Sequence, residues 1–349
     1  MENYPLSRRL CMTLMAASIS APLGAQGPSL MQFEGADRAR KLAAAATAEQ
    51  TLNVYTALRP QDVQTVIGPF EKKHDIRLSV WRSGSDNVMR RVMTEARGKR
   101  FEADVVMITS PELEAIRREK LLQPFSSPYL ADLVHPASRP AHREWATVLM
   151  NVWVQAYNTN LVRRQDLPRT YQDLADPKWK GMLGVEAKVS EWYATVAREM
   201  GEEKGIQMFR EIVGRNGVSV RQGMSLLNNL VVAGEVPLAL TMYIDLPEKA
   251  KRAGKPVDWF TLEPVAAMGL NIGVARHAPH PHAALLFVDY MLSPETQRLL
   301  ASLFYYPASN KADTPYPDLR LKVVDPVYTI DTFDAWTKSY EDVVTKRAK

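Results

Sequence analysis

Short apolar runs alternate with amphipathic stretches from residue 51 onward. Runs at 52–56, 76–81 and 103–108 predict strands, the first of them buried, and the stretch that begins at Pro60 carries apolar side chains at helical spacing. Strands that alternate with helices in this way predict a parallel sheet covered by helices on its faces. The wholly apolar run at 105–108 is typical of a sheet that is buried on both sides.

A second set of alternating elements follows two long apolar segments. The segments at 145–157 and 267–275 are long enough to pass from one domain into another. Strands are predicted at 182–185 and 236–241. Helices are predicted at 193–200 (capped by Ser190), 203–214, 225–233, 282–292, 294–304 and 332–345, with a helix and turn at 171–181.

The first 25 residues have the pattern of a secretory signal. Arg8 and Arg9 precede a short apolar stretch from Leu10 to Ala21, and small residues follow it up to Ala25. The stretch is too short to span a bilayer, which needs about 20 apolar residues. We expect an exported, periplasmic protein, by the Sec or the twin-arginine route.

Composition narrows the class of protein further. A chain of 349 residues is long enough for two domains, and its net charge of +5 is dispersed, unlike that of a nucleic-acid binder. The one cysteine, Cys11, lies in the signal. The mature chain therefore has no disulfide, no cysteine-ligated zinc or iron–sulfur site and no thiol nucleophile.

The ends of the predicted strands carry the candidate binding residues. In open α/β sheets, ligands bind at the carboxyl ends of the strands, where helix N-termini present free N–H groups. In the first half these positions are Arg59, Ser83, Gly84, Ser85 and Thr109. In the second half the candidates are Ser190 and Trp192 at a helix start (Trp192 as wall or core), Arg221 before a helix, and Tyr243 and Asp245 after a strand.

The order and spacing of several short motifs resemble a known family. They are Leu52–Tyr55, Ala103–Val106, Tyr157–Thr159, Asp176–Gly181, Ala233–Val236, Ala278–Pro281 and Leu292–Glu295. Over residues 50–310 the chain resembles the type 2 periplasmic solute-binding proteins, in the iron(III)-binding branch. The resemblance implies two α/β lobes, each a mostly parallel sheet flanked by helices and joined by crossing strands, which close on a ligand and pass it to an ABC permease.

The resemblance also implies the division of the chain and its partners. We expect a monomer that is not an enzyme, needs no cofactor and binds no nucleic acid. The expected parts are a signal peptide (1–25), an N-terminal tether or loose helix (26–50), lobe 1 (51–150 plus 267–310), lobe 2 (151–266) and a C-terminal closing segment (311–349).

The metal ligands of the iron(III) branch are largely absent from this sequence. The family offers a His after the first strand, a Glu after the third and two adjacent tyrosines in the second lobe. Here Arg59, Thr109 and Tyr243–Asp245 occupy these places, and a guanidinium has no lone pair for a metal. Only Tyr243 and Asp245 of this set could ligate iron. Arg59 favours a small anionic organic compound as the ligand, with an iron(III) chelate next.

Three alternatives stay open from the sequence. The first is a ferric-iron-binding protein with altered ligands, and the second is a partner for a membrane sensor. The third is a periplasmic hydrolase that uses Ser190–Glu191 and Asp245, with His135 or His142 as base. Tyr305–Tyr306 is expected to pack, and His277, His280 and His282 are expected to form a capping loop.

Overall fold

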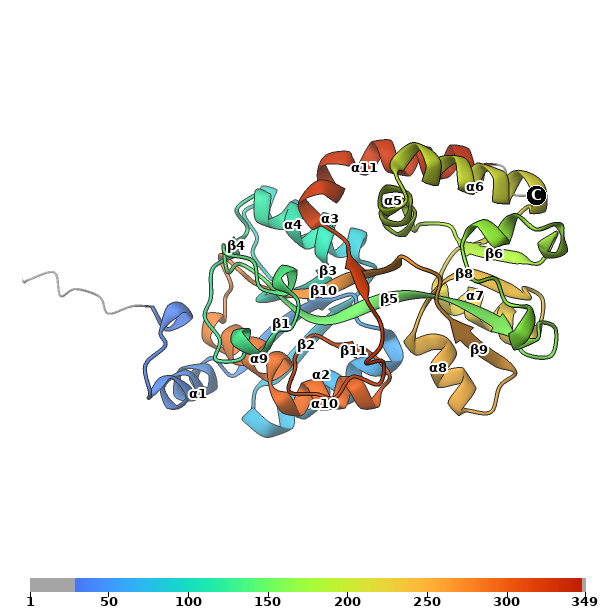
Figure 1. Ribbon diagram of the computed structural model, residues 1–349. Helices are drawn as coiled ribbons and strands as arrows, with labels where there is room; N and C mark the ends of the chain where they lie inside the picture. The colour runs from blue at the N-terminus through green and yellow to red at the C-terminus, as the bar shows by residue number, and fades with distance from the viewer. Residues whose placement is uncertain (1–28, 347–349) are drawn as a thin grey trace, which may run out of the picture.

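The computed structural model describes residues 29–346. The predicted signal peptide at 1–25 therefore lies outside the described residues. The segment expected as a tether or loose helix contains a packed helix, α1 (Arg38–Glu49), which lies beside α9 at the outer end of the molecule (Figure 1). Leu42 and Ala46 of α1 are buried, and Arg38 forms a buried ion pair with Asp289. Residues 38–49 are thus part of the first half rather than a free tether.

The first half is built on the predicted βαβ units. Its strands β1 (Thr51–Thr56), β2 (Arg77–Arg82) and β3 (Val105–Thr109) are parallel, in the order β2-β1-β3. The strands are covered by α2 (Pro60–His74), α3 (Ser85–Arg97), α4 (Ser110–Arg118), α9 (Pro281–Leu292) and α10 (Pro294–Ser302). Apolar residues of β1 and β3 are buried on both faces, as the continuous apolar runs predicted.

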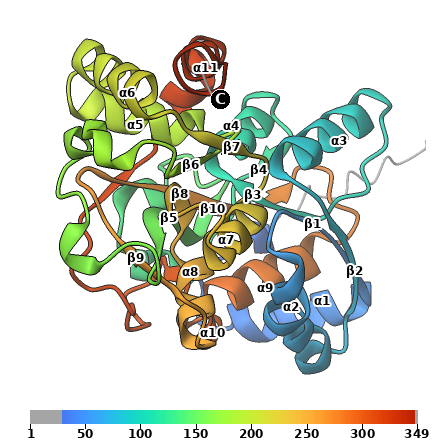
Figure 2. The same cartoon turned by 90° about the vertical axis from the view of Figure 1, so that its right-hand side faces the viewer.

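The second half repeats this arrangement with shorter strands. β6 (Leu183–Glu186) pairs in parallel with β7 (Ser219–Arg221) and β8 (Leu238–Tyr243), and β9 (Val257–Phe260) lies antiparallel beside the crossing strand. Its helices are α5 (Ser190–Glu199), α6 (Glu202–Asn216), α7 (Met224–Ala233) and α8 (Asp245–Arg252). Seen from the side of this half, α7 and α8 lie in front of the crossing strands (Figure 2). The predicted helix at 171–181 is instead two short 3₁₀ turns.

Two long strands join the halves, as the sequence predicted. β5 (Ala146–Asn158) and β10 (Val265–Ala275) run antiparallel to each other and lie between β3 and β8 in one continuous order, β2-β1-β3-β10-β5-β8-β6-β7. Three short strands pair beside these two: β4 (Leu122–Gln123) and β12 (Leu321–Val323) on β10, and β11 (Tyr306–Pro307) on β5. The carboxyl ends of the parallel strands in each half consequently meet the other half.

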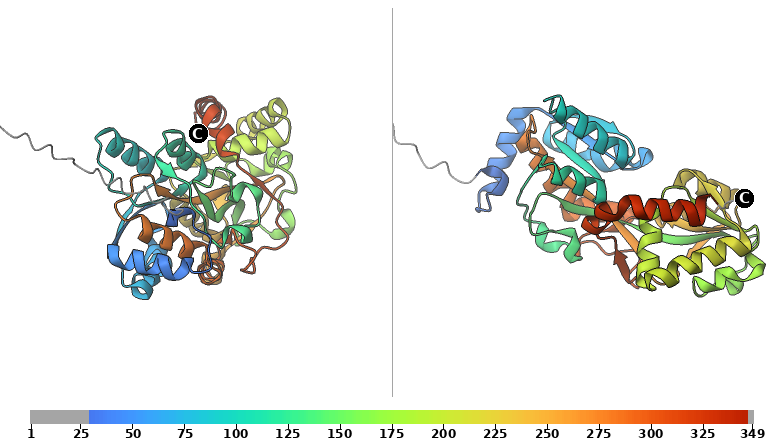
Figure 3. Two further views of the ribbon diagram at one scale, coloured as in Figure 1. Left: turned by 90° about the vertical axis from the view of Figure 1, so that its left-hand side faces the viewer. Right: turned by 90° about the horizontal axis from the view of Figure 1, so that it is seen from above.

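The C-terminal segment packs against both halves. Helix α11 (Pro326–Tyr340) lies along α4 of the first half and α5 of the second, and the view from above shows it running over the junction (Figure 3). Arg118 of α4 pairs with Asp331 at 2.5 Å, and Trp336 packs edge-on against Tyr193 of α5 with centroids 5.7 Å apart. No helix within residues 29–346 is both long and apolar enough to cross a membrane.

Candidate functional site

Arg59 of the first half contacts Asp245 of the second. Arg59 is the last residue before α2, and Asp245 is the first residue of α8. The guanidinium Nη2 and the carboxylate Oδ1 lie 2.5 Å apart, and the two side chains are only 13% and 2% exposed. The ion pair therefore lies directly between the two halves and is largely shielded from water.

Two tyrosine rings flank the guanidinium of Arg59. Its Cζ lies 5.5 Å from the ring centroid of Tyr243 and 5.8 Å from that of Tyr305. Burial opposes the charged form of Arg59, but the charge and hydrogen bond of Asp245, together with Tyr305 and Tyr243, outweigh burial and raise the pKa of Arg59 above its ordinary value. Arg59 is thus a fixed positive charge whose partners are already present in the protein.

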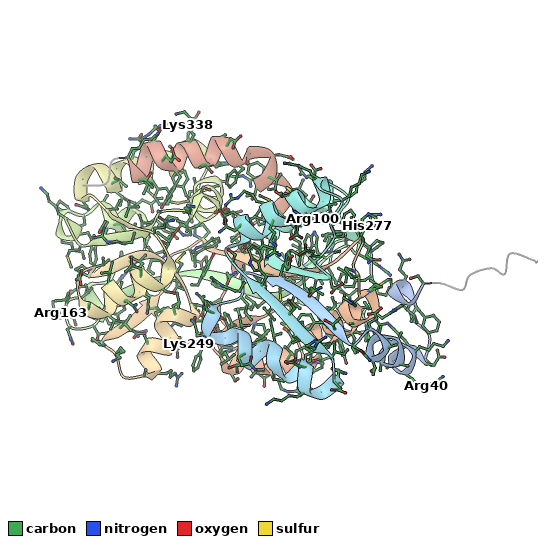
Figure 4. The ribbon with its side chains drawn as sticks, turned by 180° about the vertical axis from the view of Figure 1, so that it is seen from behind. Arg40, Arg100, Arg163, Lys249, His277 and Lys338 are labelled. Carbon is green, nitrogen blue, oxygen red and sulfur yellow. The ribbon has the colours of Figure 1, made fainter. Side chains whose placement is uncertain are left out.

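A second ion pair joins the same two helices. Lys249 of α8 lies 2.8 Å from the carboxylate of Asp62 in the first turn of α2, and the hydroxyl of Tyr305 donates to the same carboxylate at 2.5 Å. Lys249 Nζ is also 3.9 Å from Asp245 Oδ2 and 4.8 Å from the Tyr305 ring centroid. Figure 4 shows Lys249 at the border between the halves.

Two carboxyl groups from opposite halves interact beside this network. Glu112 lies in the first turn of α4 and Glu191 in the first turn of α5. Burial and then the nearby charge of Glu112 raise the pKa of Glu191 to about 8, and burial raises the pKa of Glu112. Glu112 accepts a hydrogen bond from the hydroxyl of Thr109 at 2.5 Å. Within residues 29–346, neither carboxyl group has an ion-pair partner.

Tyr243 lies between the ion pairs and the two carboxyl groups. Burial, and then the charge of Glu191, raises the pKa of its hydroxyl far above the ordinary value, while Arg59 opposes the shift. Buried Glu186, at the end of β6, adds a further negative charge, and its carboxylate accepts the backbone N–H groups of Lys188 and Gly223. The phenol is therefore neutral at physiological pH unless a cation approaches it.

The remaining first-half candidates hold the backbone around this region. Gly84 is the cap residue of α3, and the hydroxyl of Ser85 accepts the backbone N–H of Thr109 at 3.2 Å. This contact fixes the end of β3 against the start of α3. Ser83 accepts a hydrogen bond from the side chain of Asn87 at 3.1 Å.

The second-half candidates are dispersed. The hydroxyl of Ser190 lies 3.3 Å from that of Thr337 on α11, and exposed Arg221 donates to the carbonyl of Val220. Trp192 is 0% exposed and packs against Phe209, with centroids 5.2 Å apart. Our inclusion of Trp192 among the binding residues is therefore wrong, because its ring lies on the apolar face of α5 and fills the core of the second half.

The histidines have structural partners. His280 contacts Asp104 and His282 contacts Glu49, both at the start of α9, in agreement with the expected capping loop. The rings of His135 and His142 accept backbone N–H groups two residues further on. In the described part of the chain, no group of three or more His, Cys, Asp or Glu side chains could hold a metal ion.

Sequence reasoning missed several residues that meet between the halves. Tyr305 was expected only to pack, and it is buried, but its hydroxyl also binds Asp62. Glu191 was singled out only for hydrolase chemistry. No sequence pattern singled out Asp62, Lys249 or Glu112 as binding residues, because charged residues are common in the first and last turns of helices.

Two α/β halves that are joined by crossing strands, with strand ends and helix starts facing each other, define a type 2 periplasmic binding protein. Residues 102–320 match the family model described as bacterial extracellular solute-binding protein. The chain belongs to this family, in its iron-binding-protein-like branch, and the resemblance drawn from the motifs is confirmed. It is accordingly a solute-binding protein of the periplasmic type.

Several relatives support this assignment over most of the chain. The chain is 25% identical over 300 residues to the Fe(3+)-binding periplasmic protein of Serratia marcescens, which covers 81% of this chain and 88% of that protein. Iron-bound HitA from Pseudomonas aeruginosa has a TM-score of 0.72 at 22% identity, covering 84% of this chain and 99% of HitA. AfuA from Actinobacillus pleuropneumoniae, with fructose-6-phosphate bound, has a TM-score of 0.73 at 20% identity, covering 84% and 98%.

Proposed function

We propose that this protein is the solute-binding component of an ABC importer and that its solute presents a metal cation to oxygen atoms of the protein, with an iron(III) complex as the first candidate. The solute would bind between the halves, where Glu112, Glu191 and Tyr243 supply oxygen atoms. Closure would then present the loaded protein to an inner-membrane permease. In this proposal the protein acts as a monomer and catalyses no reaction.

The observation that carries the proposal is the pair of uncompensated carboxyl groups. Glu112 and Glu191 come from opposite halves, and burial, followed by the charge of Glu112, raises the pKa of Glu191 to about 8. A group of carboxyl oxygens in a water-poor site is stabilised by a cation that neutralises it. A metal centre held between them would therefore also favour closure of the halves.

Arg59 supports an anionic solute less than the sequence suggested. We expected its guanidinium to be available to a carboxylate or phosphate of the solute. Asp245 instead lies against it at 2.5 Å. An incoming anion would have to compete with this internal carboxylate and would meet the negative charges of Glu112 and Glu191.

An iron complex fits the donor set better than a bare ferric ion. Carboxylate and phenolate oxygens are hard donors of the kind that iron(III) prefers. Glu112, Glu191 and Tyr243 would supply three atoms and leave the rest of an octahedral shell to the oxygens of a chelator. The Serratia marcescens relative is named as an Fe(3+)-binding protein, which agrees with this choice.

A small organic anion is the second candidate. The AfuA structure holds fructose-6-phosphate on the same fold, and helices α4 and α5 both start beside the carboxyl pair. Free N–H groups at helix starts favour anions. Glu112 and Glu191 oppose this, because both lie in those first turns.

Titration calorimetry with three probes separates the two candidates. Ferric citrate, citrate alone and fructose-6-phosphate are each added to the wild type, to Arg59→Ala and to a Glu112→Gln/Glu191→Gln double variant. Of the three probes, we expect only ferric citrate to bind the wild type. Arg59→Ala should still bind it, with a loss of about 1–3 kcal/mol in binding free energy, and the double variant should not bind it. Binding of either organic anion that requires Arg59 but neither glutamate would contradict it.

A further inference from the structure

We propose that a network of charges between the two halves acts as a latch that holds the protein closed before any solute arrives. The latch consists of Arg59, Asp62 and Tyr305 of the first half and Asp245 and Lys249 of the second. It extends the proposed function, since it would set the fraction of molecules open to solute, but it can be tested without a solute. These five side chains would act as positioning residues for capture.

The two ion pairs of the latch join one half to the other. Both ion pairs connect the N-terminal end of α2 to α8. They are Arg59–Asp245 at 2.5 Å and Asp62–Lys249 at 2.8 Å. Lys249 Nζ is also 3.9 Å from Asp245 Oδ2, an oxygen atom that has no hydrogen-bond partner among the described residues. Lys249 therefore links the two ion pairs into one network.

Burial makes this network different from surface ion pairs. The side chains of Asp62 and Asp245 are 7% and 2% exposed, whereas those of Lys251 and Asp258, an ion pair within the second half, are 44% and 15% exposed. Exposed pairs contribute little because water screens them. Pairs shielded from water interact more strongly, provided that their remaining polar atoms are satisfied.

Tyr305 supplies one of the hydrogen bonds that the buried carboxylate of Asp62 needs. Its hydroxyl donates to Asp62 at 2.5 Å, and its ring lies within 5.8 Å of the Arg59 guanidinium and 4.8 Å of the Lys249 ammonium. An aromatic face stabilises a desolvated cation. Opening the halves would separate both ion pairs and remove Lys249 from this ring, while Tyr305 and Asp62 would remain together in the first half.

The network also contains more charge than a packed interface needs. Helices α2 and α8 could meet through apolar side chains, which would hold the halves together with no sensitivity to salt. Four charges make closure reversible, because each charged group regains hydration when the halves open. A solute that binds both halves would add its own contacts to this balance and shift it further towards the closed form.

Small-angle scattering of the unliganded protein tests the latch. Lys249→Gln removes the residue that links the ion pairs, and Lys251→Gln removes a charge from the same helix without touching the other half. If the latch holds the halves together, the wild type and Lys251→Gln should have the same, small radius of gyration. Lys249→Gln should have a larger radius of gyration. Added salt should expand the wild type in the same direction.

Stopped-flow binding of ferric citrate supplies the second readout. If the wild type is mostly closed, Lys249→Gln should raise the association rate constant by about tenfold and should also raise the dissociation rate constant. A purely structural loss would raise only the dissociation rate. Asp62→Asn, which removes the carboxylate partner of Lys249, provides a second variant in case Lys249→Gln folds poorly.

The outcomes separate the latch from the proposed function. Equal radii of gyration for the wild type, Lys249→Gln and Asp62→Asn would overturn the latch, even if all three bind ferric citrate. Expansion in Lys251→Gln equal to that in Lys249→Gln would also overturn it. Expansion confined to the latch variants, with no binding of ferric citrate by any protein, would support the latch and refute the iron complex.

Discussion

Replacing Glu191 by glutamine tests whether the carboxyl pair binds the solute. The substitution keeps the size and the hydrogen-bonding shape of the side chain and removes its charge. A contact with a charged group contributes roughly 1.5–3 kcal/mol, so the affinity for ferric citrate should fall by about 10- to 100-fold. The loss should grow as the pH rises towards 8, because the wild-type carboxyl group then loses its proton more readily.

The pH dependence follows from the raised pKa of Glu191. In the unliganded protein this carboxyl keeps its proton up to a pKa of about 8, compared with an ordinary value of 4.5. A cation that binds the carboxylate must displace the proton, so wild-type affinity should rise between pH 6 and pH 8, by up to about tenfold per pH unit. Glu191→Gln should flatten this part of the rise.

The same shift predicts a change in the stability of the unliganded protein. Between pH 4.5 and about 8 the folded chain holds a proton on Glu191 that the unfolded chain has released. Stability should therefore fall as the pH rises through this window, and Glu191→Gln should remove that part of the slope. Thermal unfolding at a series of pH values measures it.

Calorimetric titration at pH 6, 7 and 8 provides the binding data. Glu203→Gln is the matched control, because Glu203 is an exposed carboxylate in the first turn of the neighbouring helix α6. Changes in ferric citrate with pH affect all three proteins equally, and so cancel in the ratio to the control. An unchanged affinity and an unchanged pH slope in Glu191→Gln would refute the assignment of Glu191 to the solute site.

Further substitutions test the contacts of the fold and of the site. Asp245→Asn leaves Arg59 buried without its carboxylate, so we expect a loss of about 3–5 kcal/mol in unfolding free energy and new, weak binding of citrate alone, as seen by denaturant titration and calorimetry. Trp192→Ala should lower the unfolding free energy by about 3–5 kcal/mol through a cavity in the core, while the solute affinity of the folded fraction stays unchanged. Arg38→Ala should release α1, because it leaves Asp289 as a buried charge without its partner. Hydrogen exchange should then rise in residues 38–49 but not in α8.

Most of the secondary structure could be predicted because burial imposes a period on the sequence. The largely apolar strands β3, β5 and β10 are buried along most of their length, and the sequence located each of them to within two residues at either end. Helix α1 was underestimated because its apolar side chains are alanines apart from Leu42, so they mark no strongly apolar face. Its position depends on the ion pair with Asp289, a residue 251 positions away, which no local pattern reveals.

The short elements of the second half were missed for related reasons. β7 has three residues and β9 has four, too few for a period to be recognised. Helix α8 follows β8 almost directly and contains Pro247 within its first turn, so the sequence suggested only the end of a strand. This omission concealed Lys249, which lies one turn beyond Asp245 on the same helix face.

The sequence placed three neighbouring candidate residues at strand ends, but it did not reveal their charge balance. Strand ends pointed to Arg59, Tyr243 and Asp245, and the structure brings these three side chains together. The sequence treated Arg59 and Asp245 as separate candidates, and their contact spans 186 positions. Only that contact reveals that the positive charge of Arg59 already has a partner.

The central claim, that a solute binds between the halves through its metal cation, is tested most directly by native mass spectrometry of protein isolated with its solute. We expect one stoichiometric adduct of the mass of an iron(III) complex, present in the wild type and in Arg59→Ala and absent from the Glu112→Gln/Glu191→Gln variant. An adduct of purely organic mass that persists in the double variant and disappears in Arg59→Ala would contradict the account.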